Sequence, residues 1–236
     1  MKVRTLLPAL LVLGALAVGG QVLLHRHRPA SAPALEEGVL AAGGGLRAVA
    51  AEVVWFRADR LQEEGRYAEL AQLANTLAWL EPHTPEVWSY AAWNLAYNVS
   101  VMMPTAEDRW RWVQAAIRLL RDEGLRLNPR SAELYRELAW LFELKIGTDL
   151  DTAAAVYRAE WKKTVEDVRA RNAWAELGMD PVLMARIEQA TGFDDWTDPQ
   201  LSAIYWAARG GAADIVRQAS ILYRKRVNCK HGESIL

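Results

Sequence analysis

Thiol and imidazole groups, on which many catalytic and metal sites depend, are scarce in this chain of 236 residues. It holds one cysteine, Cys229, and four histidines. A single cysteine excludes an intramolecular disulfide framework and a zinc site built on pairs of thiolates. No histidine stands in an H-E-x-x-H sequence or beside a G-x-S-x-G nucleophile, and His25-x-His27 is explained as part of a basic stretch beside a membrane anchor. We therefore predict no catalytic residue, no metal site and no cofactor.

An excess of charge of either sign is also absent. The chain carries 28 Lys and Arg against 29 Asp and Glu, which gives a net charge of −1 at pH 7. Such a balance provides no overall field that would steer the protein toward nucleic acid. Acidic pairs such as Glu63 with Glu64 and Asp194 with Asp195 are interpreted as exposed charges or helix caps. A nucleic-acid partner is not expected.

Proline and glycine are confined to a few breaks, and the rest of the chain is rich in apolar residues. Hydrophobic residues make up 52% of the sequence and include 11 tryptophans. This composition is typical of folded chains and not of disordered ones. The length allows one domain of about 150–200 residues together with a tail or an anchor.

The first 28 residues differ from all that follow. Met1–Arg4 carries two positive charges, Thr5–Leu24 is an uncharged run of 20 residues, and His25–Arg28 is basic. A helix of about 20 residues spans the roughly 30 Å of bilayer hydrocarbon, whereas a cleaved signal has an apolar stretch of about 7–15 residues. We predict that residues 1–28 are an export signal retained as a single-pass anchor, with the body on the extracytoplasmic side. Cleavage after Gly20 is the alternative.

A linker and then a series of helices are expected after the anchor. Residues 29–45 contain a Pro- and Ala-rich spacer and the flexible triplet Gly43–Gly45. From Leu46 onward, apolar residues recur at intervals of three and four, which predicts an all-α chain. Prolines and capping residues mark the breaks between helices. The helices are expected near residues 46–64, 66–81, 85–101, 105–127, 131–146, 149–177, 180–191, 198–209 and 211–227.

Two of these helices begin with the same spacing of residues. One reads Trp88-x2-Ala91-Ala92-x2-Leu95 and starts six residues after Pro82; the other reads Tyr135-x2-Leu138-Ala139-x2-Phe142 and starts six residues after Pro129. Both resemble the W-x2-L-G-x2-Y first helix of the tetratricopeptide (TPR) repeat. The prolines are 47 residues apart, against the 34 of one repeat, so an insertion is expected around residues 99–108.

The resemblance implies antiparallel helical hairpins stacked as a short TPR-like solenoid. Residues 46–165 would form two to three units, and residues 166–236 would form a helical C-terminal extension that caps the open end. Ala92 and Ala139 stand where the two helices of a hairpin approach most closely, and a larger side chain there would push them apart.

The resemblance also implies that the first helices of the units line one concave face. Counted from Pro85 and Ala132, Trp93 and Trp140 both fall at the ninth position. If exposed, they would anchor a peptide or a partner helix. The alternative is that both tryptophans pack beneath the C-terminal extension. We predict that the partner-binding residues are Trp55, Asp59, Tyr90, Trp93, Tyr97, Arg136 and Trp140.

Two classes of function stay open at this point. The first is a membrane-tethered interaction or scaffolding module, which an open face without convergent polar groups would favour. The second is an enzyme or a small-ligand binder, which a closed polar pocket between the repeats and the extension would favour. The residues around such a pocket would be Trp140, Glu143, Asp194, Asp195 and Trp206.

Overall fold

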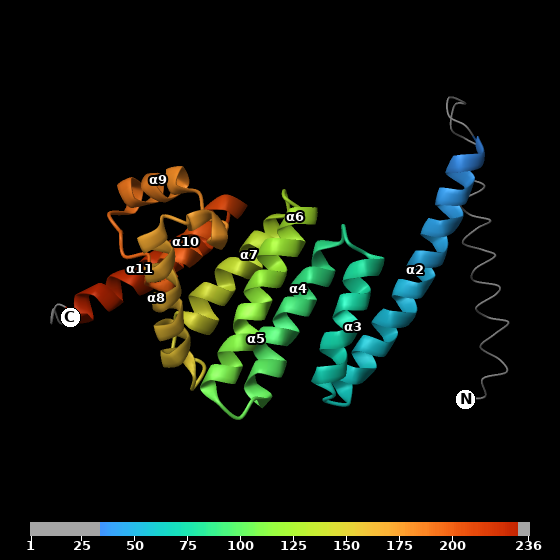
Figure 1. Ribbon diagram of the computed structural model, residues 1–236, viewed down its shortest axis with the longest axis horizontal. Helices are drawn as coiled ribbons and strands as arrows, with labels where there is room; N and C mark the ends of the chain where they lie inside the picture. The colour runs from blue at the N-terminus through green and yellow to red at the C-terminus, as the bar shows by residue number, and fades with distance from the viewer. Residues whose placement is uncertain (1–33, 231–236) are drawn as a thin grey trace.

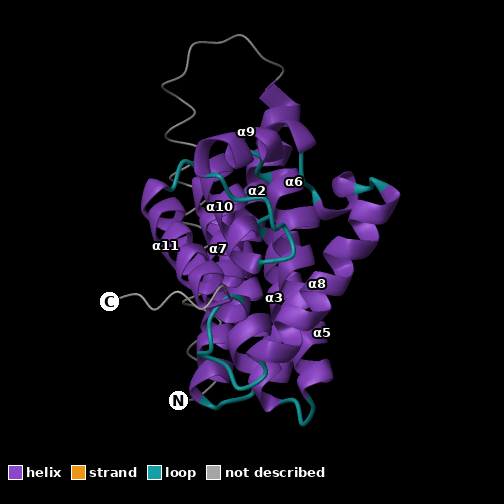
Figure 2. Cartoon of the chain, turned by 90° about the vertical axis from the view of Figure 1, so that its left-hand side faces the viewer, coloured by secondary structure: helices purple, strands orange, loops and turns teal. Residues whose placement is uncertain are grey.

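The computed structural model describes residues 34–230, and every regular element in this part of the chain is a helix (Figures 1 and 2). The all-α prediction is therefore confirmed. The α-helices are α2 (Ala34–Glu63), α3 (Tyr67–Leu80), α4 (Pro85–Trp93), α5 (Ala106–Arg118), α6 (Leu125–Leu127), α7 (Ala132–Trp140), α8 (Ala154–Arg171), α9 (Pro181–Thr191), α10 (Pro199–Gly210) and α11 (Ala213–Lys230). Three π-helical segments, η2 (Asn94–Val99), η4 (Leu119–Gly124) and η5 (Leu141–Ile146), and two 3₁₀ turns, η3 (Ser100–Met102) and η6 (Trp174–Leu177), extend or join them.

Consecutive helices pack side by side, as Figure 1 shows from α2 to α8. Helix α3 contacts both α2 and α4, α5 contacts η2 and α8, and α4 contacts α7. Helices α9, α10 and α11 lie at the C-terminal end of the row, where α10 packs against α7 and α11. One continuous core of apolar side chains runs from Ala58 in α2 to Tyr223 in α11.

Local capping sets the beginnings of several helices. Thr105 and Ser131 precede α5 and α7, and their hydroxyl oxygens accept hydrogen bonds from the backbone N–H groups of the first turns. The carboxylates of Asp180 and Asp198 do the same for α9 and α10, each of which starts on a proline. A cap supplies an acceptor for an N–H that has no partner inside the helix. The starts predicted from these residues are confirmed to within two residues.

The glycine triplet Gly43–Gly45 departs from the prediction, because it lies inside α2 and is not a flexible joint. A glycine costs about 1 kcal/mol relative to alanine inside a helix. Here Ala, Leu and Glu stand on both sides of the triplet, and these strong helix formers continue the helix across it. Residues 34–45 of the predicted linker are thus helical, and residues 29–33 lie outside the described residues.

The predicted helix over residues 149–177 is also replaced by a shorter one. Asp151 Oδ1 accepts a hydrogen bond from the Ala153 backbone N–H at 2.9 Å, so residues before Ala154 form a turn and not a helix. At the other end, Asn172 adopts the left-handed conformation with φ of 52°. Asparagine tolerates this conformation better than most residues, and it ends α8 there.

The two segments that share a sequence pattern also share a structure. Helices α4 and α7 each contain nine residues and each continue into a six-residue π-helix, at positions 47 residues apart. Trp88 Nε1 donates to the Pro82 carbonyl at 3.0 Å, and Tyr135 Oη donates to the Pro129 carbonyl at 3.2 Å. Ala92 and Ala139 are fully buried, as expected for a close helix crossing.

The C-terminal helices cover a face of α7 different from the one that carries Trp140. Tyr135 stacks on Trp206 of α10 with ring centroids 6.3 Å apart. A Cβ on Gly210 would lie 2.6 Å from the Tyr135 Cβ, so only glycine allows this approach. The extension is therefore docked through Tyr135 and Trp206, which leaves Trp140 outside this contact.

Within residues 34–230, none of the helices is both long enough and apolar enough to cross a bilayer. The predicted anchor, residues 1–28, lies outside the described residues, as do His25, His27 and His231.

Candidate interaction face and pocket

Two tryptophans lie at equivalent ends of α4 and α7 and remain partly open to solvent. Trp93 is 42% exposed and Trp140 is 37% exposed. Each is the last residue before a π-helical segment, a feature that is often found at functional sites. The alternative in which both pack beneath the C-terminal helices does not agree with these exposures.

The side chains one turn further on extend the same surface. Trp93 stacks on Tyr97 with ring centroids 6.0 Å apart and an interplanar angle of 27°. Leu144 follows Trp140 by one turn, and Tyr97 and Leu144 line one pocket together. We call the surface formed by Trp93, Tyr97, Trp140 and Leu144 the tryptophan face.

The predicted residues Trp55 of α2 and Tyr90 of α4 lie together and contact each other. The rings of Trp55 and Tyr90 are 5.2 Å apart. Trp55 Nε1 donates to Glu81 at 3.3 Å, and Tyr90 Oη donates to Gln62 at 2.7 Å. Asp59 is exposed, and its charge adds to burial in raising the pKa of Tyr90. These contacts hold α2 against α4, and Asp59 adds a negative charge beside them.

Acidic groups border the tryptophan face on α7. Burial raises the pKa of the half-buried Glu137, the charge of Glu133 raises it further, and the exposed Arg136 partly opposes this. Burial also raises the pKa of Tyr97 to about 12, to which Glu137 and Glu143 contribute. The predicted residue Arg136 thus lies beside this acidic border.

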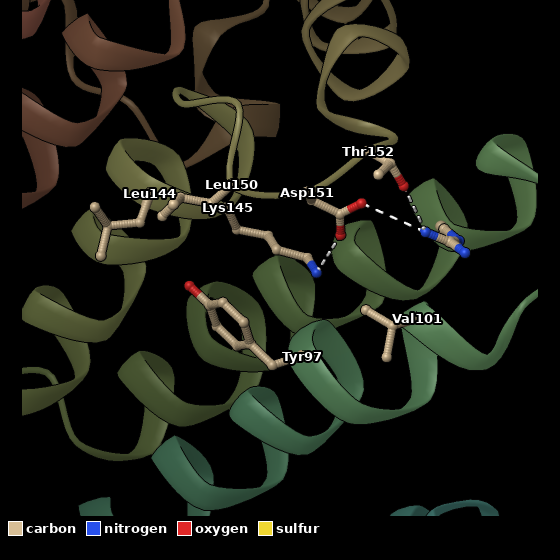
Figure 3. A pocket seen from close by; sticks show the side chains of 8 residues that line it. Tyr97, Val101, Leu144, Lys145, Leu150, Asp151 and Thr152 are labelled. Carbon is tan, nitrogen blue, oxygen red and sulfur yellow. Dashed lines mark hydrogen bonds and ion pairs between the residues drawn. The ribbon is translucent and has the colours of Figure 1, made fainter.

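A pocket of about 330 Å³ opens at one end of the tryptophan face (Figure 3). It lies where η2 and η3, the start of α5, η5 and the turn before α8 meet. Its walls are partly apolar and partly charged. The lining residues are Tyr97, Val101, Arg109, Leu144, Lys145, Leu150, Asp151 and Thr152.

A buried ion pair forms the polar wall of this pocket. Lys145 Nζ lies 2.6 Å from Asp151 Oδ2, and both side chains are almost wholly buried. Lys145 Nζ also lies 5.0 Å from the centroid of the Tyr97 ring. The Tyr157 hydroxyl donates to Asp151 at 3.1 Å, and Arg109 Nη1 lies 3.5 Å from the same carboxylate. Figure 3 shows the Lys145 side chain reaching the Asp151 carboxylate.

Burial and pairing act on these pKa values in opposite directions. Burial alone would raise the pKa of Asp151, but hydrogen bonds from Lys145, the Ala153 backbone N–H and Tyr157 bring it below its ordinary value. Burial lowers the pKa of the Lys145 ammonium, which the hydrogen bond to Asp151 opposes. The arrangement therefore keeps Asp151 ionised as the acceptor of the cluster.

Sequence reasoning identified Tyr97 but missed Lys145, Asp151 and Arg109. These three come from different elements, and no short motif connects them. One available signal was Lys145 itself, a charged residue between the apolar Leu144 and Ile146 in a segment whose residues are mostly buried.

The residues named for the enzyme alternative do not line either of the two cavities described in this part of the chain. Glu143 and Trp206 are buried at the contact between η5, α7 and α10. Asp194 is exposed, and Asp195 accepts hydrogen bonds from Thr197 in the turn before α10. The two aspartates thus act within a loop and do not meet the other members of the set in a described cavity.

Comparisons with known proteins add no family to this description. No protein-family model matches the chain, and neither a curated protein nor a solved structure matches it.

Proposed function

We propose that the protein is a membrane-tethered interaction or scaffolding module that binds a peptide or a partner helix on the tryptophan face. The observation that carries the proposal is the partial exposure of Trp93 and Trp140 at equivalent positions of two helices. Tryptophan is enriched among the residues that dominate binding energy, because its large apolar area is buried at little cost in side-chain entropy. The role is a binding role and not a catalytic one.

The proposal includes a TPR-like stacking of the hairpins. It is supported by the 47-residue repetition of α4–η2 in α7–η5 and by the paired hydrogen bonds of Trp88 and Tyr135 to the prolines that precede them. In such an array the first helices share one face, and a bound segment contacts the same position of successive units. Residues 1–28 would hold this face near the bilayer.

Partner capture by the full-length protein, extracted from its native membrane in mild detergent, tests the proposal. Protein recovered with the wild type should be lost with Trp93→Ala and with Trp140→Ala, because each removes an aromatic anchor. Trp112→Ala, in α5 and outside the four residues that define the tryptophan face, is the matched control and should capture normally. Circular dichroism establishes that all three variants remain folded. Equal capture by all the variants would reject the tryptophan face as the binding surface.

A further inference from the structure

The pocket beside the tryptophan face contains hydrogen-bond donors that the described residues do not use. Lys145 Nζ has three N–H groups, and the hydrogen bond that it donates goes to Asp151. Arg109 donates from Nε to the Met103 carbonyl and from Nη1 to Thr152. Its Nη2 has no hydrogen-bond partner among residues 34–230. Both side chains line the pocket, and Figure 3 shows Lys145 on its wall. Two cationic groups therefore contribute to the lining.

The balance of charge inside the pocket favours an anion. The lining contains two cations, Lys145 and Arg109, and one carboxylate, Asp151. Asp149, in the same turn, lies 2.7 Å from Arg158 Nη2 and is neutralised there. One positive charge is therefore left without a counter-charge in the lining. A single carboxylate would balance it and would accept hydrogen bonds from a guanidinium and an ammonium at once.

The other lining residues limit the size and polarity of the uncharged part of such a ligand. Tyr97, Val101, Leu144 and Leu150 supply apolar surface. The volume of about 330 Å³ is near the lower end of the range of roughly 300–1,000 Å³ seen for small-molecule sites. The pocket thus fits a short apolar group with the acid at one end.

We propose that this pocket binds a carboxylate carried on a short apolar body, with Arg109 and Lys145 as its hydrogen-bond donors. Thr152 accepts from Arg109 Nη1 at 3.2 Å and so keeps the guanidinium plane at the pocket wall. Two sources of this chemistry are a free organic acid and an acidic side chain flanked by apolar residues. The inference does not depend on the partner proposed for the tryptophan face.

Calorimetric titration of the purified full-length protein with hexanoate tests the site. Hexanamide has the same body without the charge, and hexylammonium reverses the charge. Hexanoate should bind at least about tenfold more tightly than either, because hydrogen bonds to a charged acceptor are the stronger ones. Equal affinities for the three compounds, or no binding of hexanoate, would overturn the proposal.

A pair of variants at the pocket rim keeps the test independent of folding. Leu150 is 78% exposed, so Leu150→Gln and Leu150→Glu should both fold. The two side chains match in size and differ in charge. Leu150→Glu should bind hexanoate several-fold more weakly than Leu150→Gln, and Arg109→Gln should lose about tenfold in affinity. Equal binding by the Leu150 pair would place hexanoate elsewhere and count against the site.

The two sources are separated by a second titrant, the peptide acetyl-Leu-Leu-Glu-Leu-Leu-amide, whose only charge is the glutamate. Binding of hexanoate alone, with the dependence on Arg109, assigns the pocket to free acids. Binding of the peptide with the same dependence assigns it to an acidic side chain of a partner segment. Failure of both rejects the anion site but not the tryptophan face, because Trp93 and Trp140, the two anchors of that face, do not line the pocket, whereas Tyr97 and Leu144 belong to both.

Discussion

The segments 82–101 and 129–148 have the same backbone plan and different chemistry. In each, a proline carbonyl accepts a hydrogen bond from an aromatic side chain six residues later. In each, a buried alanine stands at the helix crossing, and a partly exposed tryptophan precedes a π-helix. The shared residues therefore position the helices, whatever the site does.

The differences that bear on the pocket lie just after the tryptophans. Tyr97 corresponds to Leu144, Asn98 to Lys145, and Ala96 to the buried Glu143. The pocket is lined in part by both segments where they diverge, and the lysine of its ion pair belongs to the second segment, while Asp151 follows that segment. The residues that the two segments share set the arrangement of the helices, and the residues that differ supply the buried charges.

Removing the buried cation that distinguishes the second segment should have the largest effect. Lys145→Met leaves Asp151 buried with the Ala153 backbone N–H, the Tyr157 hydroxyl and the more distant Arg109 beside it. Breaking a buried pair by removal of one partner costs about 3–5 kcal/mol. Urea unfolding should show this loss. Asn98→Ala changes the equivalent position, where one hydrogen bond to Asn94 is lost, and should cost about 1 kcal/mol.

The Lys145–Asp151 pair also makes the stability of the wild type depend on pH in the acid range. The folded-state pKa of Asp151 is lower than its ordinary value of 3.8. The stabilisation from its ionised form is therefore complete above that ordinary value and is lost as pH falls through the lowered pKa. Lys145→Met should reduce this acid-dependent loss. Stability curves of the two proteins that stay parallel through the acid range would show that the pair contributes little.

Overpacking of the helix crossings tests what the two segments share. Ala92→Leu and Ala139→Leu each add methyl groups where no space remains, and each should cost about 1–3 kcal/mol. Ala185→Leu in α9, at an exposed position, should change the stability by no more than about 0.5 kcal/mol. Thermal or urea unfolding measures all three. A large effect at only one of the two buried alanines would mean that the segments do not cross their neighbours in the same way.

The helix boundaries could be predicted from the sequence better than the pocket could, for physical reasons. Caps such as Thr105, Ser131 and Asp198 act on the helices that they begin, so local sequence contains the information. The ninth-position tryptophans follow from the repeat spacing. The cluster of Lys145, Asp151 and Arg109 depends on how three separate elements come together, which no local pattern encodes. The π-helical segments could not be predicted from the sequence either, because their residues have the same spacing as those of an α-helix.

Neutralising Glu143 should stabilise the second segment. The side chain is 2% exposed, and its Oε1 has no hydrogen-bond partner among the described residues. Burial, and then the charge of Asp214, raise its pKa above the ordinary 4.5. Burial of a charged carboxylate is unfavourable, and Glu143→Gln keeps the volume and removes that charge, so we expect a gain of about 1–2 kcal/mol at pH 8.

The pH dependence of that gain is the sharper measurement. With a raised folded-state pKa, the wild type retains its full stability with respect to this group below the ordinary value of 4.5 and loses it as pH rises through the raised pKa. Glu143→Gln has no such loss, so the two unfolding curves should converge in acid and separate toward neutral pH. Ala96, the equivalent residue, carries no charge and predicts no such behaviour for the first segment. A constant difference at all pH values would mean that Glu143 is hydrated.

The smallest expected effect concerns the hydrogen bond that both segments repeat. Tyr135→Phe removes the donor to the Pro129 carbonyl and keeps the ring that stacks on Trp206. Since the Pro129 carbonyl accepts a side-chain bond that is only part-buried, water can replace it, and the loss should be about 1 kcal/mol. Tyr90→Phe removes a hydroxyl bonded to Gln62 at a more exposed place and should cost less. Urea unfolding at one pH compares the two directly. If Tyr135→Phe lowered the free energy of unfolding no more than Tyr90→Phe, the hydrogen bond to the Pro129 carbonyl would not help to stabilise the start of the helix.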